Sequence, residues 1–199
     1  KHGRDGNSMS IKTGKVVSVH IGAEDTLEKQ ACTTIEIALD GIVGDRHRGI
    51  SRNNWSGDKQ AEGTERRNER MWSAISAEDV EIIAADMDLA EPLSASSLGV
   101  NLCLQGIADL SRLPRGTLLT FSSGVVLMVE EYNPPCSDMG EKLAGMHSTK
   151  SGELLASTAF SKAAKFTRGI VGVVEVAGSI SVDDEFTVEA EVLPKWLRV

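Results

Sequence analysis

Hydrophobic and polar residues alternate with a period of two along much of the chain, which is typical of β-strands with one buried face. The clearest case is TTIEIALD, in which Ile35, Ile37 and Leu39 fall on one face. Similar runs predict strands at 14–21, 33–40, 71–76, 98–104, 116–121, 124–132, 169–178, 179–182 and 185–192. Short turns at 122–124 and 178–179 favour a hairpin at each place.

Three segments have helical rather than strand spacing. Ser76 is suited to cap a helix predicted over 77–87, because acidic residues follow it in the first turn. The stretches 137–146 and 151–166 mix polar and apolar residues without alternation, and they are also predicted to be helical.

Many short strands with few helices between them predict a mainly β fold with inserted helices (α+β), closed or nearly closed into a β-barrel. Strands rarely alternate with helices, which disfavours a doubly wound sheet. Residues 9–199 are expected to form a single domain, since no repeat or linker interrupts them. Residues 1–8, KHGRDGNS, are expected to be an appended segment, with Met9 as the native start.

Composition excludes several classes of function. A net charge of −8 argues against nucleic-acid binding, which needs a basic face. The apolar run GIVGVV, 169–174, is too short to cross a bilayer, and no apolar leader begins the chain. Three cysteines without a CxxC pair favour reduced thiols over a disulfide framework. A cytoplasmic protein that binds neither nucleic acid nor membrane is expected.

The segment 41–70 has little periodicity and is too long for an ordinary connection, so we expect it to be functional or disordered. Its net charge is +2, whereas the rest of the chain carries −10. A locally positive segment on an acidic protein suits an anionic small molecule better than a polyanion. The alternative is a solvated surface loop with no specific role.

The segment 41–70 opens with GIVGDRHRG, residues 41–49, whose three glycines permit tight turns and close approach to a ligand. Asp45, Arg46 and His47 lie between these glycines, and arginine offers a planar fork suited to phosphate or carboxylate. The pattern matches no phosphate-loop template, so a charged loop remains the plain alternative.

Cys136 follows a strand-forming run and two prolines, in VEEYNPPCSDM. Proline fixes its own backbone and removes a donor, so the pair ends the ladder and holds the chain stiffly before the thiol. Its neighbours are not those of a core residue, which favours a reactive or ligating thiolate. A buried structural cysteine is the alternative, and it is the interpretation favoured for Cys32 and Cys103.

A third candidate site is KFTRG, in which Lys165, Arg168 and Gly169 lie at the start of a predicted strand. Strand starts often line the rim of a barrel, where these two cations are suited to bind an anion. Taken alone, this pattern favours two solvated side chains and a turn glycine. The three tryptophans are interpreted as packing residues: Trp55, Trp72 and Trp196.

Four separated segments together resemble the MOSC domain, named for the C-terminal domain of molybdenum cofactor sulfurases. They are GIVGDRHRG (41–49), LGVNLCLQGIADLSRLPRGTLLTF (98–121), VVLMVEEYNPPCSDM (125–139) and FTRGIVGVVEVAGSISVDDEF (166–186). Their order and spacing fit the family, and the similarity runs from about residue 11 to 188. The resemblance implies a barrel-like fold and one reactive cysteine, Cys136.

The resemblance also implies a site. Cys136 would carry sulfur, or would ligate the molybdenum of a pterin dithiolene cofactor as a thiolate, and stiff neighbours would fix its position. The implied pocket for this anionic cofactor consists of Asp45, Arg46, His47, Asn101, Lys165, Arg168 and Gly169. Two positions depart from the family pattern: Gly-Glu-Asn is replaced by Gly99-Val100-Asn101, and glycine-aspartate by Asp183-Asp184.

The leading hypothesis is a molybdenum-cofactor protein that reduces N-hydroxylated compounds. The chain has no flavin or iron–sulfur segment and no extra N-terminal barrel, so a separate electron-transfer protein is expected. Two alternatives stay open: a sulfur carrier bearing a persulfide on Cys136, supplied by a sulfur donor, and a non-catalytic cofactor-binding module. The substrate, the partner and the oligomeric state do not follow from the sequence.

Overall fold

The computed structural model describes residues 11–24, 26–190 and 196. Two expectations lie outside the described residues: that Met9 is the native start, and that residues 1–8 are an appended segment. The end of the strand predicted over 185–192 also lies outside them.

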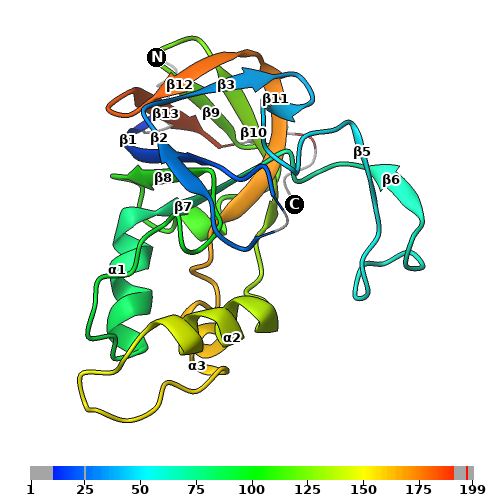
Figure 1. The fold of residues 1–199 in the computed structure, drawn as a ribbon. Helices are drawn as coiled ribbons and strands as arrows, with labels where there is room; N and C mark the ends of the chain where they lie inside the picture. The colour runs from blue at the N-terminus through cyan, green and yellow to red at the C-terminus, as the bar shows by residue number, and fades with distance from the viewer. Residues whose placement is uncertain (1–10, 25, 191–195, 197–199) are drawn as a thin grey trace.

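The main sheet of the described chain closes into a barrel of seven strands (Figure 1). The order around it is β13-β9-β10-β11-β7-β8-β1, and β13 pairs with β1 to close the ring. The barrel strands are β1 (Lys12–Ile21), β7 (Trp72–Ser76), β8 (Leu102–Gln105), β9 (Leu118–Phe121), β10 (Val126–Tyr132), β11 (Ile170–Val176) and β13 (Glu185–Glu189). A short strand, β2 (Gln30–Cys32), pairs with β1. The predicted mainly β barrel with inserted helices is confirmed.

Neighbouring barrel strands are antiparallel except for β7 and β8, which are parallel. Helix α1 (Ala77–Asp86) makes the crossover between them. Ser76 caps this helix as predicted, and its Oγ accepts a hydrogen bond from the Asp79 amide at 3.0 Å. The hairpin predicted at 122–124 is also confirmed, because β9 and β10 pair across that turn.

The barrel interior is filled by branched and aromatic side chains. Trp72 is 1% exposed, and its indole nitrogen donates to the Val173 carbonyl at 2.9 Å. Gly172 permits this packing, since a Cβ there would overlap the Trp72 ring and the Met128 carbonyl. Trp72 is therefore a packing residue, as expected.

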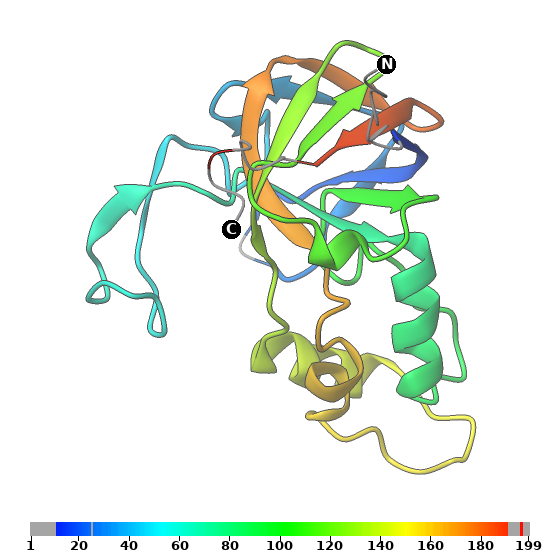
Figure 2. The same ribbon diagram turned by 180° about the vertical axis from the view of Figure 1, so that it is seen from behind.

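A second apolar cluster lies outside the barrel, among α1, α2 (Ser137–Met146) and α3 (Ala159–Ala163) (Figures 1 and 2). Val100 and Cys103 belong to this cluster, whereas Leu102 and Leu104 point into the barrel. Alternation over the predicted strand 98–104 would place Val100 on the same face as Leu102 and Leu104, and for Val100 this expectation is wrong. The strand begins only at Leu102, so the alternation does not extend back to Val100.

The hairpin predicted at 178–179 is wrong. Strand β12 (Gly178–Ser181) leaves β11 and pairs with β3 (Thr34–Ala38), which pairs in turn with β4 (Gly41–Ile42). Ile180 lies opposite Ile35 in this second sheet, and both side chains are buried, so apolar burial stabilises the long-range pairing. Leu39 lies beyond the end of β3 and is exposed, contrary to its predicted face.

Residues 50–70, here called the arm, project from the barrel (Figures 1 and 2). The arm contains a two-stranded ladder of β5 (Ser51–Asn53) and β6 (Glu65–Arg67). A 3₁₀ turn, η1 (Leu110–Arg112), follows β8. Among the described residues, no helix is both long and apolar enough to span a membrane.

Candidate functional site

One cavity of about 750 Å³ collects most of the residues that the sequence singled out. Arg46, His47, Asn101, Cys136 and Arg168 all line it, although they come from four separate segments. The remaining lining residues come from the 22–29 segment, the arm, the loop before β8, the strands β7, β10 and β11, and the segment from Asn133 into α2. They are Gly22, Thr26, Leu27, Lys29, Trp55, Ser56, Gly57, Asp58, Arg70, Ser73, Leu98, Gly99, Glu131, Tyr132, Asn133, Pro134, Pro135, Met139 and Val171.

Cys136 occupies the N-cap of α2, directly after the two prolines that end the β10 segment. Its backbone is extended and the residue is exposed, so the alternative of a buried structural cysteine does not apply to it. Asn133 anchors the segment, because its amide donates to the Gly169 carbonyl at 3.0 Å.

The other two cysteines differ from Cys136 in their surroundings. Cys103 is buried, and burial raises the pKa of its thiol to about 11. Cys32 is half-buried and packs against the barrel core. All three thiols are free, and Cys136 alone combines exposure with a place on the cavity wall.

Arg168 is the most unusual charge in the cavity. It is 7% exposed, and its Nη2 donates to the Leu98 carbonyl at 2.5 Å. Its Nη1 is buried and has no hydrogen-bond partner among the described residues. Burial lowers the pKa of Arg168 to about 10, while attraction to Cys136 opposes this shift. The guanidinium is therefore charged at neutral pH, and its Nη1 is available to donate a hydrogen bond to an anionic ligand.

Asp45 lies beneath the cavity rather than on its lining, and it organises the GDRH loop. Its Oδ2 accepts hydrogen bonds from the Lys29 ammonium, the Asn101 side chain and the Gly22 amide at 2.5, 2.8 and 3.1 Å. Its Oδ1 accepts from the backbone and Nδ1 of His47 at 3.0 and 3.1 Å. One buried carboxylate thereby fixes three side chains of the cavity wall.

The ionisation of this group follows from its contacts. Burial alone would raise the pKa of Asp45, but hydrogen bonds from His47 and the charge of Lys29 outweigh it and hold the pKa well below its usual range. Burial lowers the pKa of His47, against the opposing effect of Asp45. Burial also lowers the pKa of Lys29, and Asp45 again opposes the shift.

Asn101 faces the cavity but is already engaged in holding the fold. Its Oδ1 accepts from the backbone and hydroxyl of Ser73, both at 3.1 Å, and its Nδ2 also donates to the His20 carbonyl. Asn101 therefore joins β7, β1 and Asp45 at the cavity floor. Val100 is fully buried and is not among the residues that line the cavity.

Lys165 and Gly169 do not belong to the lining residues of the cavity. Lys165 is exposed, with its Nζ 5.3 Å from the centroid of the Phe166 ring. Gly169 has φ +98° and lies against the Ala74 carbonyl, where a Cβ would overlap backbone. Its amide donates to the Ser111 hydroxyl at 2.9 Å. Gly169 thus allows close packing at the start of β11 and positions Arg168.

The expectation that the segment 41–70 contributes to a site agrees with the arm residues on the cavity wall, but sequence reasoning missed Lys29 and the place of Trp55. Lys29 belongs to no sequence motif, and its place in the site follows only from its contact with Asp45 in the folded protein. Trp55 is 50% exposed and lines the cavity, so its interpretation as a packing residue is wrong. Trp196 is 80% exposed, and the same interpretation is wrong for it. Among the described residues, no cluster of three or more His, Cys, Asp or Glu side chains is arranged to hold a metal ion.

Fold and site together define a small barrel protein with one exposed thiol on a cationic cavity. The sequence profile of the MOSC domain matches residues 27–187. The chain therefore belongs to the MOSC domain family.

Known relatives agree with this assignment. The chain is 31% identical over 179 residues to the Bacillus subtilis (strain 168) protein named "Putative metal-sulfur cluster biosynthesis proteins YuaD", covering 89% of this chain and 91% of that protein. The crystal structure of YuaD from Bacillus subtilis has a TM-score of 0.85 at 28% identity, over 92% of this chain and 98% of that one. The crystal structure of YiiM from Geobacillus stearothermophilus has a TM-score of 0.60 at 14% identity, covering 88% and 75%, a likeness in fold alone.

Proposed function

We propose that this protein binds a molybdenum cofactor, with the Cys136 thiolate as the protein ligand to the metal, and reduces N-hydroxylated compounds using electrons from a separate protein. The observation that carries the proposal is Arg168, a buried cation with an unpartnered Nη1 on the same cavity wall as the exposed thiol. A buried donor of this kind is satisfied when an anionic group binds.

The residues present fit such a cofactor. The cavity of about 750 Å³ is large enough for a bulky organic group, and a terminal sulfur alone would need far less space. Lys29, Arg46, Arg70 and Arg168 line the cavity, and they suit a ligand that carries phosphate. One thiolate matches the soft ligation that a molybdenum centre prefers.

When bound, the cofactor supplies a metal centre that exchanges two electrons and accepts an oxygen atom. In the overall reaction the N–O bond of an N-hydroxylated substrate breaks, two electrons and two protons are taken up, and the amine or amide and one water are formed. His47 has Nδ1 held by Asp45, which leaves Nε2 to pass protons between solvent and the departing oxygen.

The test is to produce the protein in a host that makes molybdenum cofactor and to purify it without oxygen. We expect stoichiometric molybdenum and, with reduced methyl viologen as the electron donor, conversion of hydroxamic acids to amides. Protein without molybdenum would contradict cofactor binding. Molybdenum without turnover would instead support a non-catalytic cofactor-binding module.

A sulfur carrier is the second candidate, favoured by the name of the Bacillus subtilis relative and by the exposure of Cys136. In that scheme the Cys136 thiolate attacks the outer sulfur of a donor persulfide, the donor S–S bond breaks, and the donor leaves as a thiolate. Cyanide-labile sulfur in protein that lacks molybdenum would support this candidate. Both candidates place the protein in the reducing cytoplasm, with a protein partner.

A further inference from the structure

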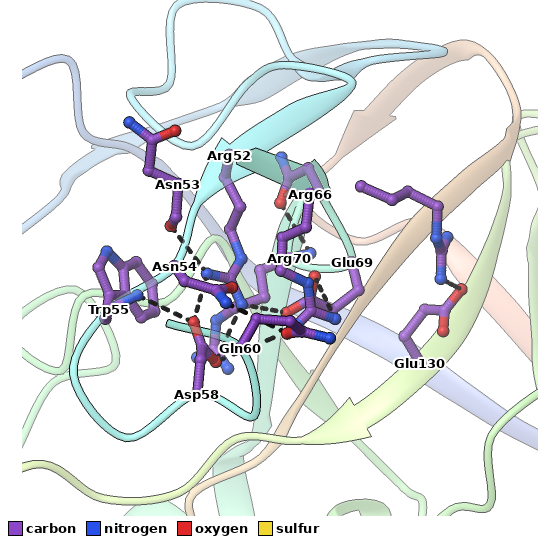
Figure 3. A network of polar contacts seen from close by, with 12 residues as sticks. Arg52, Asn53, Asn54, Trp55, Asp58, Gln60, Arg66, Glu69, Arg70 and Glu130 are labelled. Atoms are coloured by element: carbon purple, nitrogen blue, oxygen red, sulfur yellow. Dashed lines mark hydrogen bonds and ion pairs between the residues drawn. The ribbon is translucent and has the colours of Figure 1, made fainter. Parts of the chain in front are cut away.

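The arm contributes an aromatic wall to the cavity. Trp55 is half exposed, and it lines the same cavity as Cys136 and Arg168. The guanidinium carbons of Arg52 and Arg70 lie 4.7 and 5.5 Å from the centroid of the Trp55 ring. Figure 3 shows Trp55 at the edge of the polar network formed by these arginines and their acidic partners. The ring is therefore supported by cations and open to the cavity.

The polar network holds the backbone of Trp55 in place (Figure 3). Arg52 binds Asp58 through both terminal nitrogens, at 2.7 and 3.2 Å, and also donates to Glu69 at 2.5 Å. Asp58 in turn accepts a hydrogen bond from the backbone amide of Trp55 at 3.0 Å. A bidentate arginine–carboxylate pair restrains both side chains, so the tryptophan is presented at a defined position.

The base of the arm is tied to the segments that carry the rest of the site. Asn68 donates to the carbonyls of His47 and Gly49, both at 2.8 Å. Arg70 donates to the Asn133 side chain at 2.6 Å, next to the prolines that precede Cys136. These contacts therefore fix the position of the aromatic wall relative to both the His47 loop and the cysteine segment.

We propose that Trp55 selects substrates that carry a planar conjugated ring, by stacking on that ring while the N-hydroxyl group lies toward Cys136. This inference rests on the proposed function for the identity of the reacting group. A tryptophan that served only to pack the arm would gain most by being buried, yet half of this side chain faces solvent at the cavity. The position of the ring thus favours ligand contact over packing.

Benzohydroxamic acid and acetohydroxamic acid form a matched pair of probes, because they share the reacting group and differ only in the ring. We expect protein from a cofactor-competent host to bind the aromatic compound about tenfold more tightly by titration calorimetry, the size of one good stacking contact. Trp55→Ala should reduce this preference to about twofold or less, and Trp55→Phe should retain part of it. Trp196→Ala is the control for losing an exposed tryptophan outside the cavity and should keep the full preference.

The ratio of kcat/KM for the two compounds should follow the same order among the variants. Calorimetry tests the stacking role of Trp55 separately from the proposed reductase activity, since it needs no turnover. A wild-type preference that disappears in Trp55→Ala supports the stacking role even if neither compound is reduced. No preference in the wild type, or an equal preference in Trp55→Ala, would overturn the role of Trp55. A merely structural role would lower the melting temperature of Trp55→Ala without changing the ratio.

Discussion

The guanidinium of Arg168 is costly to bury without a ligand, because one of its donors has no partner among the described residues. We predict that Arg168→Met loses most of its molybdenum while the free energy of unfolding of the unloaded protein changes by no more than about 1 kcal/mol. Metal analysis and thermal unfolding measure the two quantities. Arg48→Met is the matched control, since Arg48 pairs with Asp40 and does not line the cavity. Full molybdenum retention by Arg168→Met would contradict an anion-binding role.

Asp45 links stability to pH. Its pKa is lower in the folded protein than its ordinary value of 3.8, so its stabilising contribution is present above pH 3.8 and is lost as the pH falls further. We predict that Asp45→Asn destabilises the protein by about 3–5 kcal/mol at neutral pH, because Lys29 is left buried without its counter-charge. The variant should also lose less stability than the wild type between pH 5 and pH 3, by about 1 kcal/mol or more. Urea unfolding at several pH values measures both effects, and parallel pH profiles would contradict the assignment.

Single residues were predictable where a local rule singled them out. Cys136 stands out because two prolines remove it from any ordinary strand, and Ser76 because capping chemistry is local. Lys29 and Trp55 were not predictable in this way. Their roles depend on partners at Asp45 and Arg70 that lie 16 and 15 positions away in the chain, and no local pattern encodes such contacts.

At the scale of elements, the arm is held by charges rather than by an apolar core, with Asp58 at its centre. We predict that Asp58→Asn loosens the arm, because Arg52 loses one of its two acidic partners and the amide of Trp55 loses a charged acceptor. Brief trypsin digestion should then cleave after Lys59 or Arg66 up to about tenfold faster. A tenfold change corresponds to lowering the free energy of local unfolding of the arm by about 1.4 kcal/mol.

The control for this prediction is Glu62→Gln, which removes an exposed acid from the same arm without affecting the contacts of Arg52. It should be cleaved at the wild-type rate. Equal cleavage of Asp58→Asn and wild type, or cleavage within the barrel instead of the arm, would show that Asp58 does not hold the arm in place.

Most strands were predictable from alternation, but their partners were not. The turn at 122–124 joins β9 and β10, which are neighbouring strands in the barrel. The similar turn sequence at 178–179 lies where the chain leaves the barrel sheet and enters the second sheet. The difference comes from Ile180 and Ile35, which bury each other across a long sequence separation. Tertiary burial therefore overrides the local preference for a hairpin.

At the scale of the whole molecule, the barrel brings four distant segments to one cavity. The fold class followed from counting strands and helices, while the set of motifs in order indicated the family. The predicted residue list for the site was only partly reproduced. Asp45 lies beneath the cavity, Lys165 and Gly169 do not line it, and the arm supplies a wall that no motif predicted. The path of the arm depends on contacts such as Asn68 with the His47 carbonyl, which link it to the barrel across the chain.

The most direct test of the central claim is the molybdenum content of Cys136→Ser produced in a cofactor-competent host, compared with the wild type and with Cys32→Ser. Cys136 is exposed, so its replacement should leave the melting temperature unchanged within about 2 °C. We predict that Cys136→Ser contains no molybdenum, whereas Cys32→Ser keeps the wild-type amount. Full molybdenum in a folded Cys136→Ser protein would contradict the assignment of this thiolate as the metal ligand, and unfolding of that variant would show a structural role instead.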